Sequence, residues 1–166
     1  SELIKKQNYS HLVFEDEGAN VGTVHIPDCV KNKTSQANLI LLDATTEERI
    51  QVSMDAYVIN MCQNFLAQDH INGFNNFSSY WLRSLEKIQK RLGLERYKVM
   101  KLQVEKALEI HQNTNSFDGF IPVVESLLVD YYDPMYSYQI QKKLNRVVFK
   151  GNQSEVLDYL NSLSIS

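Results

Sequence analysis

Three short apolar runs along the chain are typical of β-strands, and the long stretch between the second and the third is typical of helices. The runs cover residues 11–15, 37–43 and 146–150, and each has the length of a strand. Runs that are apolar at almost every position suit a parallel sheet, whose strands are buried on both faces. Directly after the second run, residues 45–49, which read TTEER, supply the cap chemistry that opens a helix. Strand, cap and helix in that order predict an α/β layer.

From about residue 46 to residue 143 the apolar positions mostly follow a helical period. Breaks are predicted near Gly73, Gly93, residues 114–119 and Pro134, where glycine, proline or small polar residues interrupt the pattern. Two apolar faces flank the break at Gly93: Trp81, Leu82, Leu85, Ile88 and Leu92 precede it, and Tyr97, Met100, Val104, Ala107, Leu108 and His111 follow it. Two such faces on either side of a glycine predict a helical hairpin.

The order of these elements predicts one α/β domain over residues 1–166, mostly helical, with a large helical insertion over about 46–143. Two strands precede the helical stretch and one follows it, as expected where a chain leaves a sheet and returns to it. Three strands make a thin sheet, so we expect further strands to precede residue 1. Shorter helices are predicted from Asp28 and over residues 154–163. The predicted fold is a fragment of a parallel sheet of the nucleotide-binding type.

The net charge of −3 conceals a basic segment. Residues 83–101 contain seven Lys and Arg against two Glu, whereas a helix stabilised by its own ion pairs would alternate the two signs. Arg83, Lys87, Lys90 and Arg91 share one face of the predicted helix and form a basic stripe. A solvated helix face and a phosphate-binding surface both fit this stripe. Because phosphate attraction depends on local patches, the acidic total does not exclude a nucleic-acid partner.

Tyrosines stand close to cations near the C-terminus. The members are Tyr131, Tyr132, Tyr136 and Tyr138, followed by Lys142, Lys143 and Arg146. Aromatic rings among cations can stack bases while the cations neutralise phosphates. Tyrosine also suits the edge of a core, with an apolar ring and a polar hydroxyl. Residue type alone favours packing slightly over binding.

An acidic triplet, Glu15-Asp16-Glu17, closes the first apolar run. In P-loop proteins a carboxylate at such a strand end holds Mg²⁺ or orients a water molecule. A solvated strand end fits the triplet as well. The phosphate-binding loop itself is missing, because no GxxxxGKS or GxxxxGKT sequence occurs.

Cysteine and histidine spacing predicts no metal site. Cys29 and Cys62 lack a CxxC or Cys/His pattern, so we expect two buried free thiols. No two histidines stand four residues apart. Neither a run of about 18 apolar residues nor a basic-then-apolar leader is present, so the prediction is no membrane span, no signal peptide and a cytoplasmic protein.

The stretch from residue 131 to residue 151 resembles the C-terminal signature of tRNA 2-selenouridine synthases. It reads YYDPMY, then YQ, then KK, then RVVFKG. Four further stretches are similar to the family in the same order: LVFEDEGANVG from Leu12, HIPDCV from His25, IQKRLGLERY from Ile88 and SFDG from Ser116. The resemblance spans nearly the whole chain.

The resemblance implies a tRNA-modifying enzyme. Members of this family join an N-terminal rhodanese-like domain, which carries the catalytic cysteine, to a P-loop domain. They replace the sulfur of 2-thiouridine at the wobble position by selenium from selenophosphate, with geranylation of that sulfur by geranyl diphosphate as an intermediate step. This chain is expected to begin after both the rhodanese-like domain and the P-loop, and to form the C-terminal part of a P-loop NTPase-like sheet. Cys29 and Cys62 match neither context, so no catalytic residue and no resident cofactor is assigned to the chain, which we expect to be inactive alone.

The resemblance further implies partners and site residues. The expected partners are tRNA and the rhodanese-like and P-loop parts of the same parent. Glu15 and Asp16 would coordinate or orient Mg²⁺ near a phosphate. The residues expected to bind RNA or a diphosphate are Arg83, Lys87, Lys90, Arg91, Tyr132, Tyr136, Tyr138, Lys142, Lys143 and Arg146. Two other interpretations stay open: a scaffolding lobe without RNA contact, and the remnant of a P-loop kinase-like protein.

Overall fold

The computed structural model describes residues 12–16, 20–21 and 24–163. The chain divides into two compact units. Unit 1 joins Ser1–Ala44 to Lys142–Ser166, and unit 2 is the continuous stretch Thr45–Gln141. Unit 2 therefore begins and ends within a few residues of the bounds predicted for the helical stretch. That it is an insertion in a larger P-loop sheet, and that residues 1–166 act as one domain, stay predictions.

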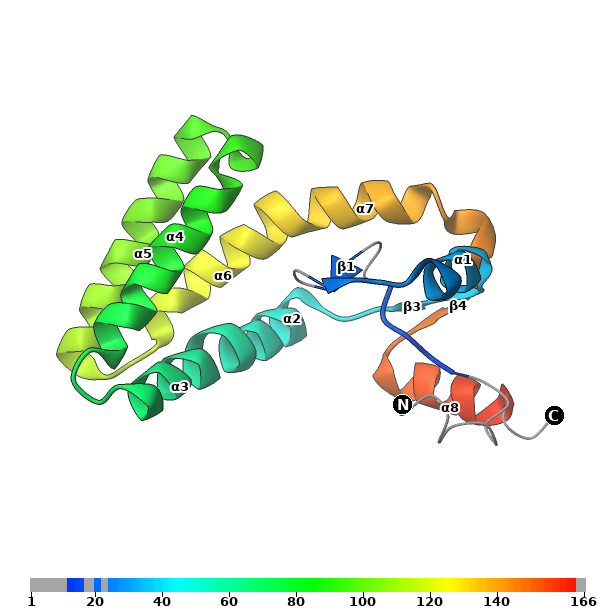
Figure 1. The fold of residues 1–166 in the computed structure, drawn as a ribbon, viewed down its shortest axis with the longest axis horizontal. Coiled ribbons are helices and arrows are strands. Elements are labelled where there is room, and N and C mark those ends of the chain that lie inside the picture. Colours follow the sequence, from blue (N-terminus) through cyan, green and yellow to red (C-terminus); the bar gives the residue numbers. More distant parts are fainter. Residues whose placement is uncertain (1–11, 17–19, 22–23, 164–166) are drawn as a thin grey trace. The chain divides into compact units, whose positions relative to one another are not determined.

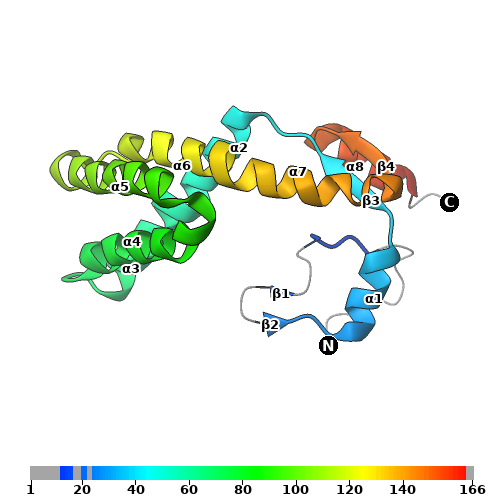
Figure 2. The ribbon, with the colours of Figure 1, turned by 90° about the horizontal axis from the view of Figure 1, so that it is seen from above.

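Unit 1 combines a short hairpin, a parallel strand pair and two helices (Figure 2). Its elements are β1 (Asn20–Val21), β2 (Val24–His25), α1 (Asp28–Gln36), β3 (Leu39–Leu42), the 3-10 turn η5 (Leu144–Arg146), β4 (Val147–Gly151) and α8 (Gln153–Leu163). β1 and β2 pair antiparallel. β3 and β4 pair parallel, with Leu41 opposite Lys150 and Leu42 opposite Gly151. The parallel pair confirms two of the three predicted strands, and α1 and α8 confirm the two short helices.

Reciprocal capping and ring stacking attach α8 to β4. The Asn152 side chain accepts a hydrogen bond from the Glu155 backbone N–H at 3.1 Å, and the Glu155 carboxylate accepts one from the Asn152 N–H at 2.8 Å. This capping box satisfies backbone donors at the start of α8. The rings of Phe149 and Tyr159 stack with centroids 4.4 Å apart, so α8 folds back against the strand that precedes it.

The strand predicted over residues 11–15 is wrong for the residues that the structure describes. Residues 12–16 have no strand pairing and are exposed, and His11 lies outside the described residues. Val13 and Phe14 instead line an apolar cavity together with side chains of β3 and α8. The apolar side chains of Val13 and Phe14 thus contact a hydrophobic surface although the backbone of residues 12–16 does not pair with a strand.

Unit 2 is helical throughout (Figure 1). Its elements are α2 (Thr46–Ser53), the π-helical segment η2 (Met54–Ile59), α3 (Asn60–Gln68), α4 (Gly73–Leu92), α5 (Leu94–Thr114), the 3-10 turn η3 (Asp118–Phe120), α6 (Ile121–Leu127), the π-helical segment η4 (Leu128–Tyr132) and α7 (Asp133–Gln141). Thr45 and Glu48 form the predicted capping box at the start of α2. Helices α4 and α5 lie side by side as the predicted hairpin, and Gly93, with φ of 81°, separates them. The predicted breaks near Gly73, at Gly93 and over 114–119 are confirmed.

An aromatic core holds unit 2 together. The rings of Phe77 and Phe120 are fully buried, with centroids 5.9 Å apart, and Trp81 packs 5.3 Å from Phe120. Burying one large apolar side chain contributes about 1.5–3 kcal/mol. The two faces predicted on either side of Gly93 supply most of the remaining core: Leu85, Leu92, Met100, Val104, Ala107, Leu108 and His111 are also buried.

The break predicted near Pro134 is wrong. The chain stays helical from Ile121 to Gln141, because the π-helical segment η4 changes the hydrogen-bond register before the proline. The Asp133 N–H bonds the Leu128 carbonyl, five residues back. Pro134 then falls at the second position of α7, where its missing N–H costs little.

The two cysteines differ in environment. Cys62 is fully buried, and its Sγ lies 3.9 Å from Nε2 of His111, whose Nδ1 lies 3.2 Å from the Ser116 carbonyl. Burial raises the pKa of the Cys62 thiol. Cys29, which was also predicted to be buried, is exposed. The reason is that α1 buries none of its side chains.

Gly73→Ala is expected to lower the free energy of unfolding by about 1–3 kcal/mol. A Cβ at this position would lie 2.5 Å from the Phe65 carbonyl oxygen and 2.7 Å from the Leu66 Cα. Both atoms belong to the backbone of α3 and cannot swing away. Chemical denaturation of the purified variant measures the effect. As a control, Asn75→Ala at an exposed position of α4 should be neutral or slightly stabilising, because alanine is the better helix former. A gain in stability for Gly73→Ala would contradict the close helix contact.

Candidate nucleic-acid interface

The predicted basic stripe is real and is exposed on α4. Arg83, Lys87, Lys90 and Arg91 are all exposed, and we call them the α4 stripe. The apolar side chains of α4 face the core of unit 2, so the stripe occupies the opposite side of the helix.

The cations of α4 and those of α5 differ in their partners. On α5, Lys98 lies 3.6 Å from Glu95 and Lys101 lies 3.8 Å from Glu105. Within the described part of the chain, no member of the α4 stripe takes part in an ion pair. Cations without an internal partner keep their charge available for a ligand.

Five tyrosines of unit 2 gather beside this stripe. We call Tyr57 (η2), Tyr80 (α4), Tyr131 and Tyr132 (η4), and Tyr136 (α7) the tyrosine cluster. The rings of Tyr131 and Tyr132 meet edge to face at 4.9 Å, and those of Tyr132 and Tyr136 stack at 6.3 Å. The phenols of the other four members all act electrostatically on Tyr132. Most of the cluster is open to solvent, with Tyr57 60% and Tyr136 51% exposed.

Two polar contacts join the α4–α5 hairpin to the helical segment that bears the tyrosines. Nη1 of Arg91 donates to the hydroxyl of Tyr131 at 3.3 Å, and Nη1 of Arg96 donates to the Asp130 carbonyl at 3.4 Å. Tyr80 stands one turn before Arg83 on the exposed side of α4. The α4 stripe and the tyrosine cluster therefore form one continuous surface of unit 2.

Sequence reasoning found only part of this surface. Tyr132 and Tyr136 were predicted and meet in the structure, and Tyr138 is exposed further along α7. Tyr57 and Tyr80 were missed. The helical spacing of Tyr80, three residues before Arg83 and seven before Lys87, is a signal that could have found it. No local pattern marks Tyr57, which reaches the cluster only through tertiary packing.

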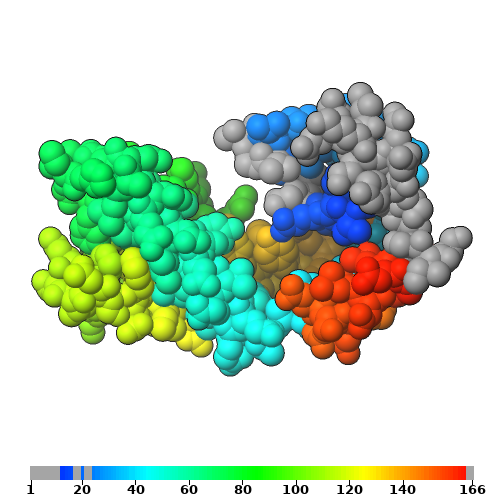
Figure 3. All heavy atoms as spheres, turned by 90° about the horizontal axis from the view of Figure 1, so that it is seen from below, coloured from blue at the N-terminus to red at the C-terminus, as the bar shows by residue number. Residues whose placement is uncertain are grey.

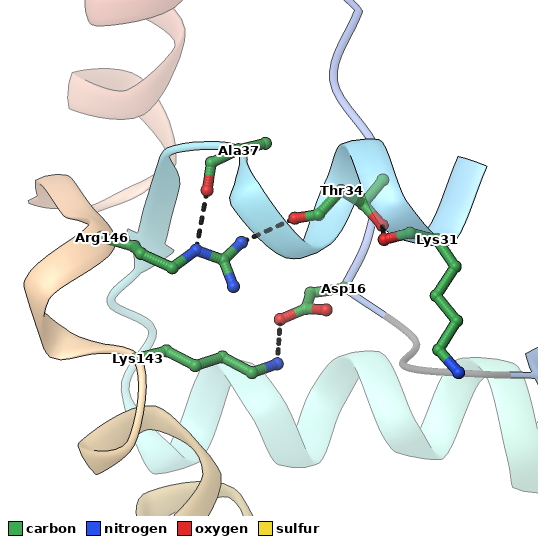
Figure 4. Close-up of polar contacts among 6 residues, drawn as sticks. All are labelled: Asp16, Lys31, Thr34, Ala37, Lys143 and Arg146. Atoms are coloured by element: carbon green, nitrogen blue, oxygen red, sulfur yellow. Dashed lines mark hydrogen bonds and ion pairs between the residues drawn. The ribbon is translucent and has the colours of Figure 1, made fainter. Parts of the chain in front are cut away.

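Three of the predicted residues of unit 1, Asp16, Lys143 and Arg146, make polar contacts within that unit (Figure 4). The Lys143 ammonium pairs with the Asp16 carboxylate at 2.5 Å. The Arg146 guanidinium donates to the carbonyl oxygens of Ala37 at 2.9 Å and Thr34 at 2.7 Å, at the C-terminal end of α1. Lys142 is exposed. Arg146 thus donates to two carbonyl oxygens at the end of α1, and that of Thr34 also accepts from the Ala37 N–H at 3.2 Å. Lys143 joins the N-terminal segment to the segment before β4.

The acidic residues offer an incomplete cation site. Among the described residues, no group of three or more His, Cys, Asp or Glu side chains could hold a metal ion. Asp16 already pairs with Lys143, and Glu15 is exposed at the edge of the apolar cavity. Glu17 lies outside the described residues. Mg²⁺ is commonly bound by one or two carboxylates together with substrate phosphates, so these two carboxylates fit only a cation that arrives with a phosphate ligand.

The apolar cavity of unit 1 has a volume of about 450 Å³. It lies between residues 12–16, β3 and α8, and Figure 3 shows the first of these segments (blue) beside α8 (red). The apolar lining residues are Val13, Phe14, Ile40, Leu42, Val156, Leu157 and Leu160. Several of them remain exposed, such as Phe14 at 54% and Leu42 at 61%.

The fold is a mostly helical α/β arrangement with a small parallel sheet. Residues 1–165 match the family model described as the tRNA 2-selenouridine synthase AAA domain. The chain belongs to this family, as the sequence motifs predicted.

Three curated relatives carry the name tRNA 2-selenouridine synthase. The chain is 36% identical to the protein of Sulfurovum sp. over 161 residues, 36% identical to that of Shewanella oneidensis over 161 residues and 34% identical to that of Photobacterium profundum over 162 residues. Each match covers 96% of this chain but only 44%, 43% and 44% of the respective relative. The chain thus spans less than half the length of these relatives. No solved structure matches the chain.

Within the residues that the structure describes, no helix has both the length and the apolar character to cross a bilayer.

Arg146→Lys is expected to lower the free energy of unfolding by about 1–2 kcal/mol, because one ammonium cannot replace both hydrogen bonds to the end of α1. Chemical denaturation measures the loss. Lys33→Arg, a charge-conserving exchange at an exposed position of α1, is the control and should change stability by less than about 0.5 kcal/mol. Unchanged stability together with weaker RNA binding in Arg146→Lys would make Arg146 a binding residue and not a supporting one.

Ionisation of Tyr132 is expected to lower the stability of the fold at alkaline pH. Burial, and next the neighbouring phenols of Tyr131, Tyr136, Tyr57 and Tyr80, raise the pKa of Tyr132 above its ordinary value of 10.0. The folded state thus favours the neutral phenol. This contribution to stability is complete below the unfolded-state pKa and is lost as the pH rises through the raised pKa. Denaturation midpoints measured across the alkaline range should fall less in Tyr132→Phe than in the unchanged protein. An equal fall in both proteins would contradict the assignment.

Proposed function

We propose that this chain is the AAA-domain part of an enzyme that replaces the sulfur of wobble 2-thiouridine in tRNA by selenium, and that it holds the tRNA. Similarity over 96% of the chain to three proteins named tRNA 2-selenouridine synthase supports this assignment. In the proposed reaction, geranyl diphosphate alkylates the sulfur and loses diphosphate. The selenium of selenophosphate then attacks the carbon that bears the sulfur, geranylthiol leaves, and hydrolysis of the Se–P bond releases phosphate. Geranyl diphosphate and selenophosphate are substrates of the whole enzyme, which works with tRNA in the cytoplasm, and the rhodanese-like and P-loop parts supply the chemistry.

The observation that carries the RNA-binding role is the α4 stripe. Its cations are exposed, share one helix face and have no ion-pair partner within the described residues. Along a helix, positions 83 and 90 are separated by about 10 Å, so the stripe can follow a phosphate backbone. Contacts with phosphates supply sequence-independent affinity and depend strongly on salt concentration.

The polar residues of unit 1 suit the smaller phosphate ligands of the proposed reaction. Lys143 and Asp16 already form an ion pair. A diphosphate would take Lys143 as its cation, and Asp16 would then be free to meet a Mg²⁺ ion bound to that diphosphate. Lys142 is exposed and lies beside Lys143 in sequence, so it would add charge for the same ligand. Arg146 would keep α1 in position beside them.

Charge reversal on α4 tests the RNA-binding role. Lys87→Glu combined with Lys90→Glu is expected to weaken tRNA binding roughly tenfold or more at moderate salt, because two phosphate contacts become repulsive. The slope of log affinity against log salt should also become shallower, by about 0.7–0.9 for each lost phosphate contact. Binding titrations at several salt concentrations measure both quantities.

The matched control reverses two cations on the neighbouring helix. Lys98→Glu combined with Lys101→Glu changes the net charge equally, but these cations are paired with Glu95 and Glu105. This variant should bind tRNA within about threefold of the unchanged protein, since only non-specific attraction is reduced. Equal binding by both double variants, with selenouridine formation intact in the full-length enzyme, would favour the scaffolding role. An affinity that barely responds to salt would do the same.

A further inference from the structure

The tyrosine cluster is built by an unusual backbone feature. Unit 2 contains two π-helical segments, and three of the five clustered tyrosines lie on them: Tyr57 on η2, and Tyr131 and Tyr132 on η4. In each segment the closing N–H bonds a carbonyl five residues back, from Asn60 to Asp55 and from Asp133 to Leu128. π-helical turns are rare, and they occur frequently at functional sites.

An ion pair joins α2 to α7 directly after η4. Both Nη atoms of Arg49 on α2 donate to the carboxylate of Asp133, the first residue of α7. Asp133 directly follows Tyr132 at the end of η4. Because the pair is partly buried, it fixes η4 relative to α2 and limits the positions that the tyrosine rings can adopt. The cluster is therefore held in place before any ligand binds.

The chemistry of the cluster fits a flat, polar-edged ligand. Its rings are open to solvent at Tyr57 and Tyr136, and the ring of Tyr132 contacts those of Tyr131 and Tyr136. A purely apolar chain would displace water from polar phenol groups without replacing its hydrogen bonds. A nucleobase has a π face for the rings and polar edges for the hydroxyls. The adjoining α4 stripe supplies cations for the phosphates of the same strand.

We infer that the tyrosine cluster is a stacking platform for an unpaired base of a single-stranded RNA loop, and this inference rests on the proposed function. Bases within a duplex are stacked on one another and their faces cannot reach side chains, whereas bases of a loop can turn outward and stack on aromatic rings. The α4 stripe binds the backbone, and the tyrosine cluster selects unpaired over paired RNA.

The test compares two RNAs that carry the fluorescent base 2-aminopurine. In one RNA the probe stands in the loop of a hairpin, and in the other it stands within a fully paired duplex with the same number of phosphates. The protein should bind the hairpin roughly tenfold more tightly than the duplex, as expected for one stacked base. Binding should also change the fluorescence of the loop probe, because its stacking partner changes.

Paired substitutions at the same positions separate stacking from folding. Tyr57→Leu with Tyr136→Leu removes both aromatic faces at exposed sites, whereas Tyr57→Phe with Tyr136→Phe keeps them. The leucine variant should lose the preference for the hairpin and the fluorescence change, but keep its affinity for the duplex and its salt dependence. The phenylalanine variant should retain most of the preference. Circular dichroism of both variants shows whether unit 2 keeps its helices.

The possible outcomes distinguish base stacking on the tyrosine cluster from phosphate binding by the α4 stripe. If the hairpin and the duplex bind equally, or the leucine variant keeps the hairpin preference, the platform is wrong while phosphate binding by α4 stands. If neither RNA binds, both proposals fail. If geranyl diphosphate displaces the loop probe at concentrations where inorganic diphosphate does not, the cluster takes an isoprenoid chain, and the base-stacking assignment is overturned.

Discussion

The packing of Phe120 against Phe77 and Trp81 determines which side of α4 can serve a ligand. These rings draw one face of the helix into the core, and because a helix presents its residues with a period of 3.6, the α4 stripe must then face outward. The absence of a side chain at Gly73 is a second requirement, since the backbone of α3 occupies the space of a Cβ. A shift of α4 about its axis would bury cations at considerable cost. The packing of the core of unit 2 therefore also determines where the cations of α4 lie.

The two π-helical segments change the direction of the side chains on the helix that follows each of them. An uninterrupted α-helix from Ile121 to Gln141 would bring a different set of side chains toward α4, because each additional residue in a turn rotates the following segment by about 100°. Tyr132 and Tyr136 are four residues apart and are neighbours on one helix face in any case. The extra residue in η4 changes the direction of Tyr131, whose hydroxyl accepts a hydrogen bond from Arg91. It also lets the helix continue through Pro134. One local change in hydrogen bonding thus accounts both for the continuous helix and for the direction of Tyr131.

Much of this architecture could be predicted from the sequence, and the failures have physical causes. The α4–α5 hairpin followed from two apolar faces around Gly93, and β3 and β4 followed from apolar runs with turn residues nearby. The run at residues 12–16 was assigned as a strand because apolar runs have the same signature whether they pair or only cover a surface. The helix break predicted at Pro134 was wrong because no sequence pattern indicates a π-helical change of hydrogen-bond register. The stripe was found from the excess of cations and from their helical spacing, whereas Tyr57 joins its cluster through contacts distant in sequence.

Whether a cation already has a partner in the fold shows better than the number of cations whether it stabilises the structure or can bind a ligand. The family resemblance assigned Arg146 and Lys143 to a ligand, yet both already contact groups of unit 1: carbonyl oxygens at the end of α1 and the carboxylate of Asp16. A ligand that takes either cation must replace those contacts, and its net gain is reduced accordingly. The α4 stripe carries no such cost for Arg83, Lys87 and Lys90, whose charges have no ion-pair partner in the described residues. A long anionic ligand therefore gains the most binding free energy on unit 2. On unit 1, a ligand must give both Lys143 and Asp16 a new partner, which only a compact, highly charged group can do.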